Sequence, residues 1–194
     1  MPQPSRLLER DQSCLVVIDV QQHFLDKLPL DRRDPLVQRI AWLIRVAAAL
    51  EIPVVAMAED LPRVGPPVDP VRDALPPGTR VHDKRVFGLA GQPEILAEVE
   101  ATGRRDLVLV GLETDVCVAH SALGLLDQGF RVAVAEDATG TPPPHQTAAL
   151  ARMEAAGVIV TSVKGIYYEW VRDLATNAAV RRRLQGPLPA GLTL

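Results

Sequence analysis

The feature that most constrains the fold of this chain is a series of short, continuous apolar runs rich in β-branched residues. Continuous runs are typical of strands that are buried on both faces, as in a parallel sheet, whereas half-exposed strands alternate apolar and polar residues. One weaker candidate, at residues 79–83, lies between the second and third clear runs. We therefore predict strands at residues 13–18, 54–58, 79–83, 107–110, 131–135 and 158–160.

Amphipathic stretches with helical spacing separate these runs. Pro35 and Pro93 are placed to open helices, and Gly129 and Gly157 to close them. Strand and helix alternate, which predicts a parallel sheet covered on both faces, joined by right-handed crossovers. The expected fold class is α/β, a doubly wound, Rossmann-like sandwich. We predict helices at residues 35–50, 93–103, 116–126, 146–156 and 167–183.

A length of 194 residues suits one α/β domain, so residues 1–194 are expected to form a single unit. Two segments depart from the regular pattern. Residues 61–78 are crowded with prolines and are predicted to form a long irregular excursion, serving as a lid or a subunit contact. The tail at residues 184–194 contains Gly186-Pro-Leu-Pro-Ala-Gly191, which cannot be helical, so it should fray or dock on a neighbouring subunit.

Charge and composition exclude several classes of partner. The formal net charge is −3, and no basic stripe interleaved with aromatic residues is present, so we expect no nucleic acid and no membrane partner. The polar N-terminal segment lacks a signal-peptide core, and no apolar run approaches transmembrane length, so we expect a cytosolic location. Cys14 and Cys117 are far apart in sequence and are expected to be free thiols.

Three reactive side chains follow predicted strands. Asp19 ends the first apolar run, Lys84 follows the third strand, and Cys117 begins a predicted helix after the fourth. The carboxyl ends of parallel strands share one edge of the sheet, so these side chains should converge there. Unpaired N–H groups and the helix dipole favour a thiolate at a helix start. Cys117 is thus predicted as nucleophile, Asp19 as base and Lys84 as electrostatic clamp, with an oxyanion hole at the N–H groups of Val116 and Cys117.

Each of these residues has an ordinary alternative. Asp19 could be a helix N-cap, Lys84 a solvated neighbour of Arg85, and Cys117 a small buried hydrophobe. His120 lies one helical turn after Cys117 and offers a Cys/His dyad. A histidine on the same helix is more typical of a packing or surface position, so we rank the group of Asp19, Lys84 and Cys117 above that dyad.

The motifs around these residues resemble those of the isochorismatase-like cysteine hydrolases. The resemblance extends over roughly residues 12–175, and its most specific part is Glu113-Thr-Asp-Val-Cys-Val118. The other matching segments are Val17-Ile-Asp-Val-Gln21, Lys84 with Phe87 shortly after, Val110-Gly-Leu-Glu113 and Gly129-Phe-Arg-Val-Ala-Val-Ala-Glu-Asp-Ala-Thr-Gly140.

The resemblance implies a three-layer α/β/α fold with a mostly parallel sheet of about six strands. It implies that Asp19, Lys84 and Cys117 form a catalytic triad. It also implies a cis peptide bond between Leu112 and Glu113, and assembly into homo-oligomers.

Cofactors and metals are not expected. Nicotinamidases of this family carry an Asp-x-His metal motif after the second strand, whereas the matching stretch here reads Met57-Ala-Glu-Asp-Leu-Pro62. Glu59 and Asp60 thus have no nearby histidine partner. No dinucleotide or phosphate-binding fingerprint is present. The remaining potential ligands, which include no pair with ligand spacing on one element, are His23, His82, His120 and His145.

The resulting prediction is a small-molecule amidohydrolase that cleaves a C–N bond through a Cys117 thioester, with Asp19 as base in both halves of the reaction. Vinyl-ether hydrolysis, which needs the aspartate but not the thiol, is the first alternative. A non-catalytic binding protein is the second. The segment Tyr167-Tyr-Glu-Trp170 reads as core packing or as a subunit interface. The predicted pocket residues are His23, Phe24, Phe87, Leu112 and Tyr167.

Overall fold

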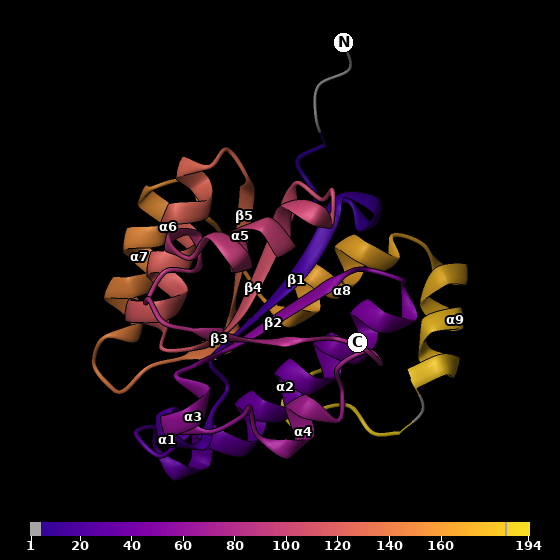
Figure 1. Ribbon diagram of the computed structural model, residues 1–194. Coiled ribbons are helices and arrows are strands. Elements are labelled where there is room, and N and C mark those ends of the chain that lie inside the picture. Colours follow the sequence, from indigo (N-terminus) through magenta and orange to yellow (C-terminus); the bar gives the residue numbers. More distant parts are fainter. Residues whose placement is uncertain (1–4, 185) are drawn as a thin grey trace.

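The computed structural model describes residues 5–184 and 186–194, and a six-stranded sheet runs through its centre (Figure 1). The strand order is β3-β2-β1-β4-β5-β6 and every pairing is parallel, which confirms the α/β fold class. Each strand overlaps a predicted one. The strands are β1 (Ser13–Ile18), β2 (Val54–Glu59), β3 (Val81–Lys84), β4 (Asp106–Leu112), β5 (Arg131–Gly140) and β6 (Ile159–Thr161).

Both faces of the sheet are buried, which explains the continuous apolar runs. Every residue of β1 and β4 is buried. Alternate residues of β1 enter opposite layers, with Leu15 and Val17 in one apolar core and Val16 and Ile18 in the other. The order of the strands reverses between β1 and β4, so the ligand crevice of such a fold lies beyond the carboxyl ends of these two strands.

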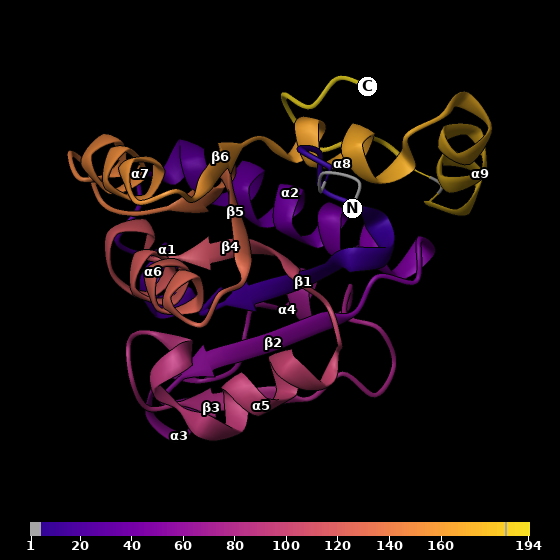
Figure 2. The same cartoon turned by 90° about the horizontal axis from the view of Figure 1, so that it is seen from above.

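Helices form a layer on each face (Figures 1 and 2). One layer contains α2 (Leu30–Ala49) and α8 (Val163–Val171), with α9 (Leu174–Leu184) packed outside them. The other contains α5 (Pro93–Ala101), α6 (Ala119–Asp127) and α7 (Gln146–Ala155). Shorter turns are η1 (Arg10–Gln12), α1 (Gln22–Leu25) and η2 (Leu89–Gly91).

Two of the predicted helix boundaries are wrong. The helix α2 begins at Leu30, and Pro35 lies inside it rather than at its start. Proline is favoured at the first position of a helix but is not restricted to it. Here α2 tolerates the missing N–H of Pro35 inside the helix. The single helix predicted at 167–183 is two helices, because Arg172 adopts a left-handed conformation with φ of 63° and turns the chain between α8 and α9. No glycine marks that turn in the sequence.

The proline-rich segment is more regular than predicted. It contains two one-turn helices, α3 (Leu61–Val64) and α4 (Asp69–Arg72), so the expectation of a wholly irregular excursion at 61–78 is wrong. Val71 is fully buried, and α4 packs against α2. The N–H of Val68 donates to the carbonyl oxygen of Val20 at 2.9 Å, which ties the segment to the chain just after β1.

The C-terminal tail docks on its own chain. Residues 186–194 contain no helix, and Leu192 is buried in the core beneath α2 and α8. Arg39 donates to the carbonyl oxygen of Ala190 at 3.0 Å. Neither fraying nor docking on a neighbouring subunit describes these contacts. Residue 185, inside the predicted tail, lies outside the described residues.

The aromatic segment at the start of the predicted last helix packs in the core. Tyr167 and Trp170 are almost completely buried, and Trp170 donates from Nε1 to Ser13 Oγ at 3.0 Å.

Within the described residues, no helix is both long enough and apolar enough to cross a membrane.

Candidate active site

Asp19, Lys84 and Cys117 converge at the carboxyl edge of the sheet. The Nζ atom of Lys84 lies 2.9 Å from Asp19 Oδ2 and 3.6 Å from Cys117 Sγ. The three residues come from the ends of β1 and β3 and from the turn after β4, which are far apart in sequence. The parallel sheet therefore brings together the three side chains that the sequence singled out.

Asp19 directly follows β1 and is fully buried. Its backbone adopts a left-handed φ of 50°, and its N–H donates to the carbonyl oxygen of Met57 at 3.1 Å. Asp19 does not cap α1, whose N-cap residue is Gln21. The Lys84 ammonium lies 2.9 Å from Oδ2 and meets the carboxylate as an ion pair, whereas Oδ1 has no hydrogen-bond partner among the described residues. Its oxygens thus keep lone pairs that can accept a proton.

Lys84 is the last residue of β3, and its side chain is fully buried. It is not a solvated neighbour of Arg85, whose side chain is 56% exposed. The Lys84 ammonium also donates to the carbonyl oxygen of Val86 at 2.9 Å. This bond directs the ammonium toward the carboxyl edge of the sheet, between Asp19 and Cys117.

Cys117 lies in a π-helical turn, η3 (Thr114–Val118), that leads into α6. The peptide bond between Leu112 and Glu113, just before this turn, is cis. Gly111 precedes it with φ of 129°, and a Cβ atom there would lie 1.9 Å from the carbonyl oxygen of Ile18. Only glycine allows β4 to approach the end of β1 so closely. This close approach sets Cys117 opposite Asp19.

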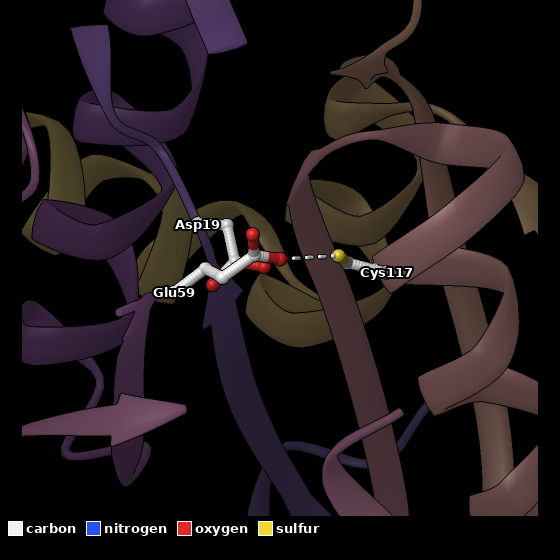
Figure 3. Close-up of side chains that lie close together, drawn as sticks. All are labelled: Asp19, Glu59 and Cys117. Carbon is white, nitrogen blue, oxygen red and sulfur yellow. Dashed lines mark hydrogen bonds between the residues drawn. The ribbon is translucent and has the colours of Figure 1, made fainter. Parts of the chain in front are cut away.

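Glu59 is a fourth member of the site that the prediction missed. It is the last residue of β2, and its Oε2 lies 3.6 Å from Cys117 Sγ and 3.7 Å from Lys84 Nζ. Figure 3 shows Asp19 and Glu59 both facing the sulfur of Cys117. The sequence contained a usable signal, because Glu59 ends an apolar run just as Asp19 does. We considered it only as half of a metal motif.

Burial controls the protonation of the site. It raises the pKa of Asp19 to about 6, against the lowering effect of the Lys84 charge. Burial and the Asp19 carboxylate raise the pKa of Cys117 well above its usual range, so the resting form is the thiol. The net direction of this pKa shift is opposite to the thiolate that we expected from the helix start. Burial lowers the pKa of Lys84, but the Asp19 carboxylate, with the Glu59 charge and the Cys117 sulfur when it is ionised, outweighs burial and raises the pKa.

The cluster also has the donor atoms of a metal site. One ligand atom from each of Asp19, Glu59 and Cys117 lies within 4.8 Å of the others. The Lys84 ammonium is 2.9 Å, 3.7 Å and 3.6 Å from these three groups. It already supplies the positive charge at their centre, and a divalent cation there would face a repelling ammonium. The residues therefore fit an internal lysine rather than a resident metal ion.

A cavity of about 230 Å³ reaches Glu59 and Lys84 from the surface. Its size suits a small molecule. A larger cavity of about 510 Å³, between α2 and the start of α7, contains none of the four clustered groups. The small cavity is lined by Glu59, Asp60, Arg63, Lys84, Arg85, Val86 and Phe87.

Of the predicted pocket residues, Phe87 is the one that lines this cavity. His23 is exposed on α1, and Phe24 is buried beneath the Lys27 ammonium, 4.6 Å from its ring centre. Leu112 is buried in the core. The expectation for Tyr167 is wrong, because α8 places its ring in the core against Trp42, with its hydroxyl donating to Asn177 at 2.6 Å.

His120, the alternative partner of Cys117, lies away from the sulfur's other neighbours. Its side chain is exposed and its ring neighbours Phe87, so the structure does not support a Cys117/His120 dyad.

The backbone N–H groups predicted as the oxyanion hole belong to Val116 and Cys117. The N–H of Val116 donates to the carbonyl oxygen of Glu113 at 3.2 Å. The oxyanion role of Val116 and Cys117 stays a prediction, and it requires Val116 to exchange that partner for substrate. Both cysteines are free.

This parallel fold, with a buried Asp–Lys–Cys cluster at its switch point, defines a hydrolase of the isochorismatase class. The Isochorismatase domain family model matches residues 13–165 of the chain. Isochorismatase domain-containing protein 2B of Mus musculus is 31% identical over 167 residues, covering 85% of this chain and 76% of that protein. The chain therefore belongs to the isochorismatase family.

Solved structures of related proteins share the fold. YcaC from Pseudomonas aeruginosa, solved with hexane-2,5-diol and covalent acrylamide, has a TM-score of 0.86 and 26% identity, covering 93% of this chain and 91% of that chain. YcaC from Escherichia coli, described as an octameric hydrolase of unknown specificity, has a TM-score of 0.85 and 24% identity, covering 94% and 90%. At 24% identity, the similarity to the Escherichia coli protein supports the fold alone.

Proposed function

We propose that this protein hydrolyses the C–N bond of a small amide through a covalent thioester on Cys117. The observation that carries the proposal is the position of the Lys84 ammonium, 2.9 Å from Asp19 and 3.6 Å from Cys117. A nucleophile, a base and a cation in contact can transfer a proton and stabilise the charge that develops. The cavity of about 230 Å³ limits the substrate to a small molecule.

The first half of the reaction begins from the thiol. Asp19 takes the Cys117 proton as the sulfur bonds to the amide carbon, and Lys84 stabilises the negative charge in the cluster. The oxyanion accepts hydrogen bonds from the N–H groups of Cys117 and Val116. Asp19 then returns the proton to the leaving nitrogen, the C–N bond breaks, and ammonia or an amine departs. Water subsequently hydrolyses the thioester.

We also propose that the protein acts in the cytosol, as a homo-oligomer. Cys14 and Cys117 are both free thiols, as suits a reducing compartment. The Escherichia coli YcaC, whose fold this chain shares, is an octamer.

The test is ammonia release from a panel of small amides by Cys117→Ala and Cys14→Ala variants. We expect Cys117→Ala to lose at least about 1,000-fold in kcat/KM while keeping its circular dichroism spectrum, because the covalent route is removed. Cys14→Ala removes the other buried thiol and should retain turnover. Undiminished ammonia release by Cys117→Ala would contradict the thioester.

A further inference from the structure

Two carboxylates face the Cys117 sulfur, and they differ in their access to solvent (Figure 3). Asp19 is fully buried, whereas the side chain of Glu59 is 19% exposed and lines the small cavity. The thiol of Cys117 donates toward Glu59 Oε2 across 3.6 Å. Glu59 therefore stands between the sulfur and the route by which a molecule from solvent would arrive.

The position of Glu59 is fixed by a buried side chain. The Gln21 amide accepts from the Glu59 N–H through Oε1 and donates to the Glu59 carbonyl oxygen through Nε2, both at 2.8 Å. The same Nε2 donates to the carbonyl oxygen of Gly65 at 2.7 Å. Gln21 itself is fully buried. This clamp fixes the end of β2, so the Glu59 side chain starts from a rigid point close to the sulfur.

The hydrolysis of a thioester, which is the second half of the proposed function, needs a base that water can reach. Asp19 is fully buried and does not line the cavity, whereas Glu59 and Lys84 do, so we take the acyl group on Cys117 to extend toward the cavity. Asp60 also lines the cavity, but hydrogen bonds from Arg63 and Arg85 lower the pKa of its carboxyl group and make it a weaker base. Of the carboxylates on the cavity side, Glu59 is the one in contact with the sulfur.

We propose that the two carboxylates divide the reaction, with Asp19 serving formation of the thioester and Glu59 acting as the general base for its hydrolysis. Glu59 takes a proton from water as the water oxygen bonds to the thioester carbon. The tetrahedral intermediate then collapses with cleavage of the C–S bond. The departing thiolate takes the proton from Glu59, and the carboxylic acid product releases its own proton to solvent. This division replaces the expectation that Asp19 is the base in both halves, and it rests on the proposed function.

The experiment measures the lifetime of an acetyl group on Cys117. The protein is acetylated briefly with p-nitrophenyl acetate, freed of reagent, and followed by intact-mass spectrometry with peptide mapping. We expect Glu59→Gln to acquire the acetyl group but to lose it about 100-fold more slowly than the unmodified protein, the size of a general-base contribution. Glu59→Asp should recover part of the rate. Glu100→Gln, which removes an exposed acid of α5 outside the cavity, should leave the lifetime unchanged.

The outcomes separate the two proposals. If Glu59→Gln loses the acetyl group as fast as Glu100→Gln does, Glu59 is not the base, although the thioester route stands. The same conclusion follows if Glu59→Asp is no faster than Glu59→Gln. If the unmodified protein acquires no acetyl group on Cys117, the proposed function fails, and the division of labour fails with it.

Discussion

At the scale of single residues, burial controls the protonation of the site. Cys117 is 2% exposed, and the desolvation of its sulfur, together with the Asp19 charge, outweighs the Lys84 charge and raises the pKa of the thiol. The thiol consequently needs a base at the moment of attack. The same burial raises the pKa of Asp19 to about 6, close to the pH at which a general base is most effective.

The ionisation of Asp19 leads to a pH prediction. Only the carboxylate can accept the Cys117 proton, so kcat/KM should fall as the pH drops through about 6, ultimately about tenfold per pH unit. The groups that face Asp19 are the Lys84 ammonium from β3, the Glu59 carboxylate from β2 and the Cys117 thiol from η3. The Glu59 charge raises the pKa of Asp19, so Glu59→Gln should move the acidic limb of the kcat/KM profile to lower pH.

The measurement is the pH profile of kcat/KM for the unmodified protein, with Glu59→Gln and Asp60→Asn, which removes the other carboxylate of the cavity, as comparisons. An acidic limb that stays near pH 4, the usual range of an aspartate, would show that Asp19 is not the titrating base. A limb that moves equally in Asp60→Asn would mean that the loss of any carboxylate of the cavity produces the shift.

At the scale of elements, the ends of four parallel strands build the site, and their spacing depends on one glycine. Gly111 in β4 lies beside Ile18 in β1, and this pair adjoins both Asp19 and the turn that carries Cys117. A Cβ atom at Gly111 would lie 1.9 Å from the Ile18 carbonyl oxygen, which belongs to backbone that cannot rotate away. The strands must separate to admit it.

We therefore predict that Gly111→Ala lowers the free energy of unfolding by more than about 3 kcal/mol, combining the clash with a strained positive φ. The matched control is Gly129→Ala. Gly129 also has a positive φ, of 82°, but its added Cβ would meet nothing within 4 Å. Gly129→Ala should therefore lower the free energy of unfolding by only about 1–2 kcal/mol. Equilibrium unfolding in urea measures both values, and equal losses would contradict the close-approach argument.

The elements also show which features could be read from the sequence. The strands were predictable, since burial on both faces leaves continuous apolar runs such as 13–18 and 107–112. The turn between α8 and α9 was not, because Arg172 adopts its positive φ without a glycine to mark it. Tyr167 was misassigned because a position after the last strand does not reveal which way a helix turns its side chains.

At the scale of the whole molecule, the active site is a product of strand order. Asp19, Glu59, Lys84 and Cys117 meet because β1, β2, β3 and β4 are neighbours in the sheet and all run the same way. The triad was predictable from residues at strand ends. Glu59 was not assigned, since an acidic residue after a strand is common and its contact with sulfur exists only once β2 lies between β1 and β3. Both helix layers then cover the sheet, and the small cavity reaches Glu59 and Lys84 at its carboxyl edge.

The most direct test of the central claim is to map the acyl group formed in a single turnover. The unmodified protein is mixed with a small amide that it hydrolyses, quenched in acid within the first turnover, digested and analysed by mass spectrometry. The account predicts the acyl mass on the peptide that contains Cys117, none on the peptide that contains Cys14, and no adduct in Asp19→Asn. Hydrolysis that proceeds at the normal rate with Cys117 unmodified throughout, or an acyl group found on another residue, would contradict it.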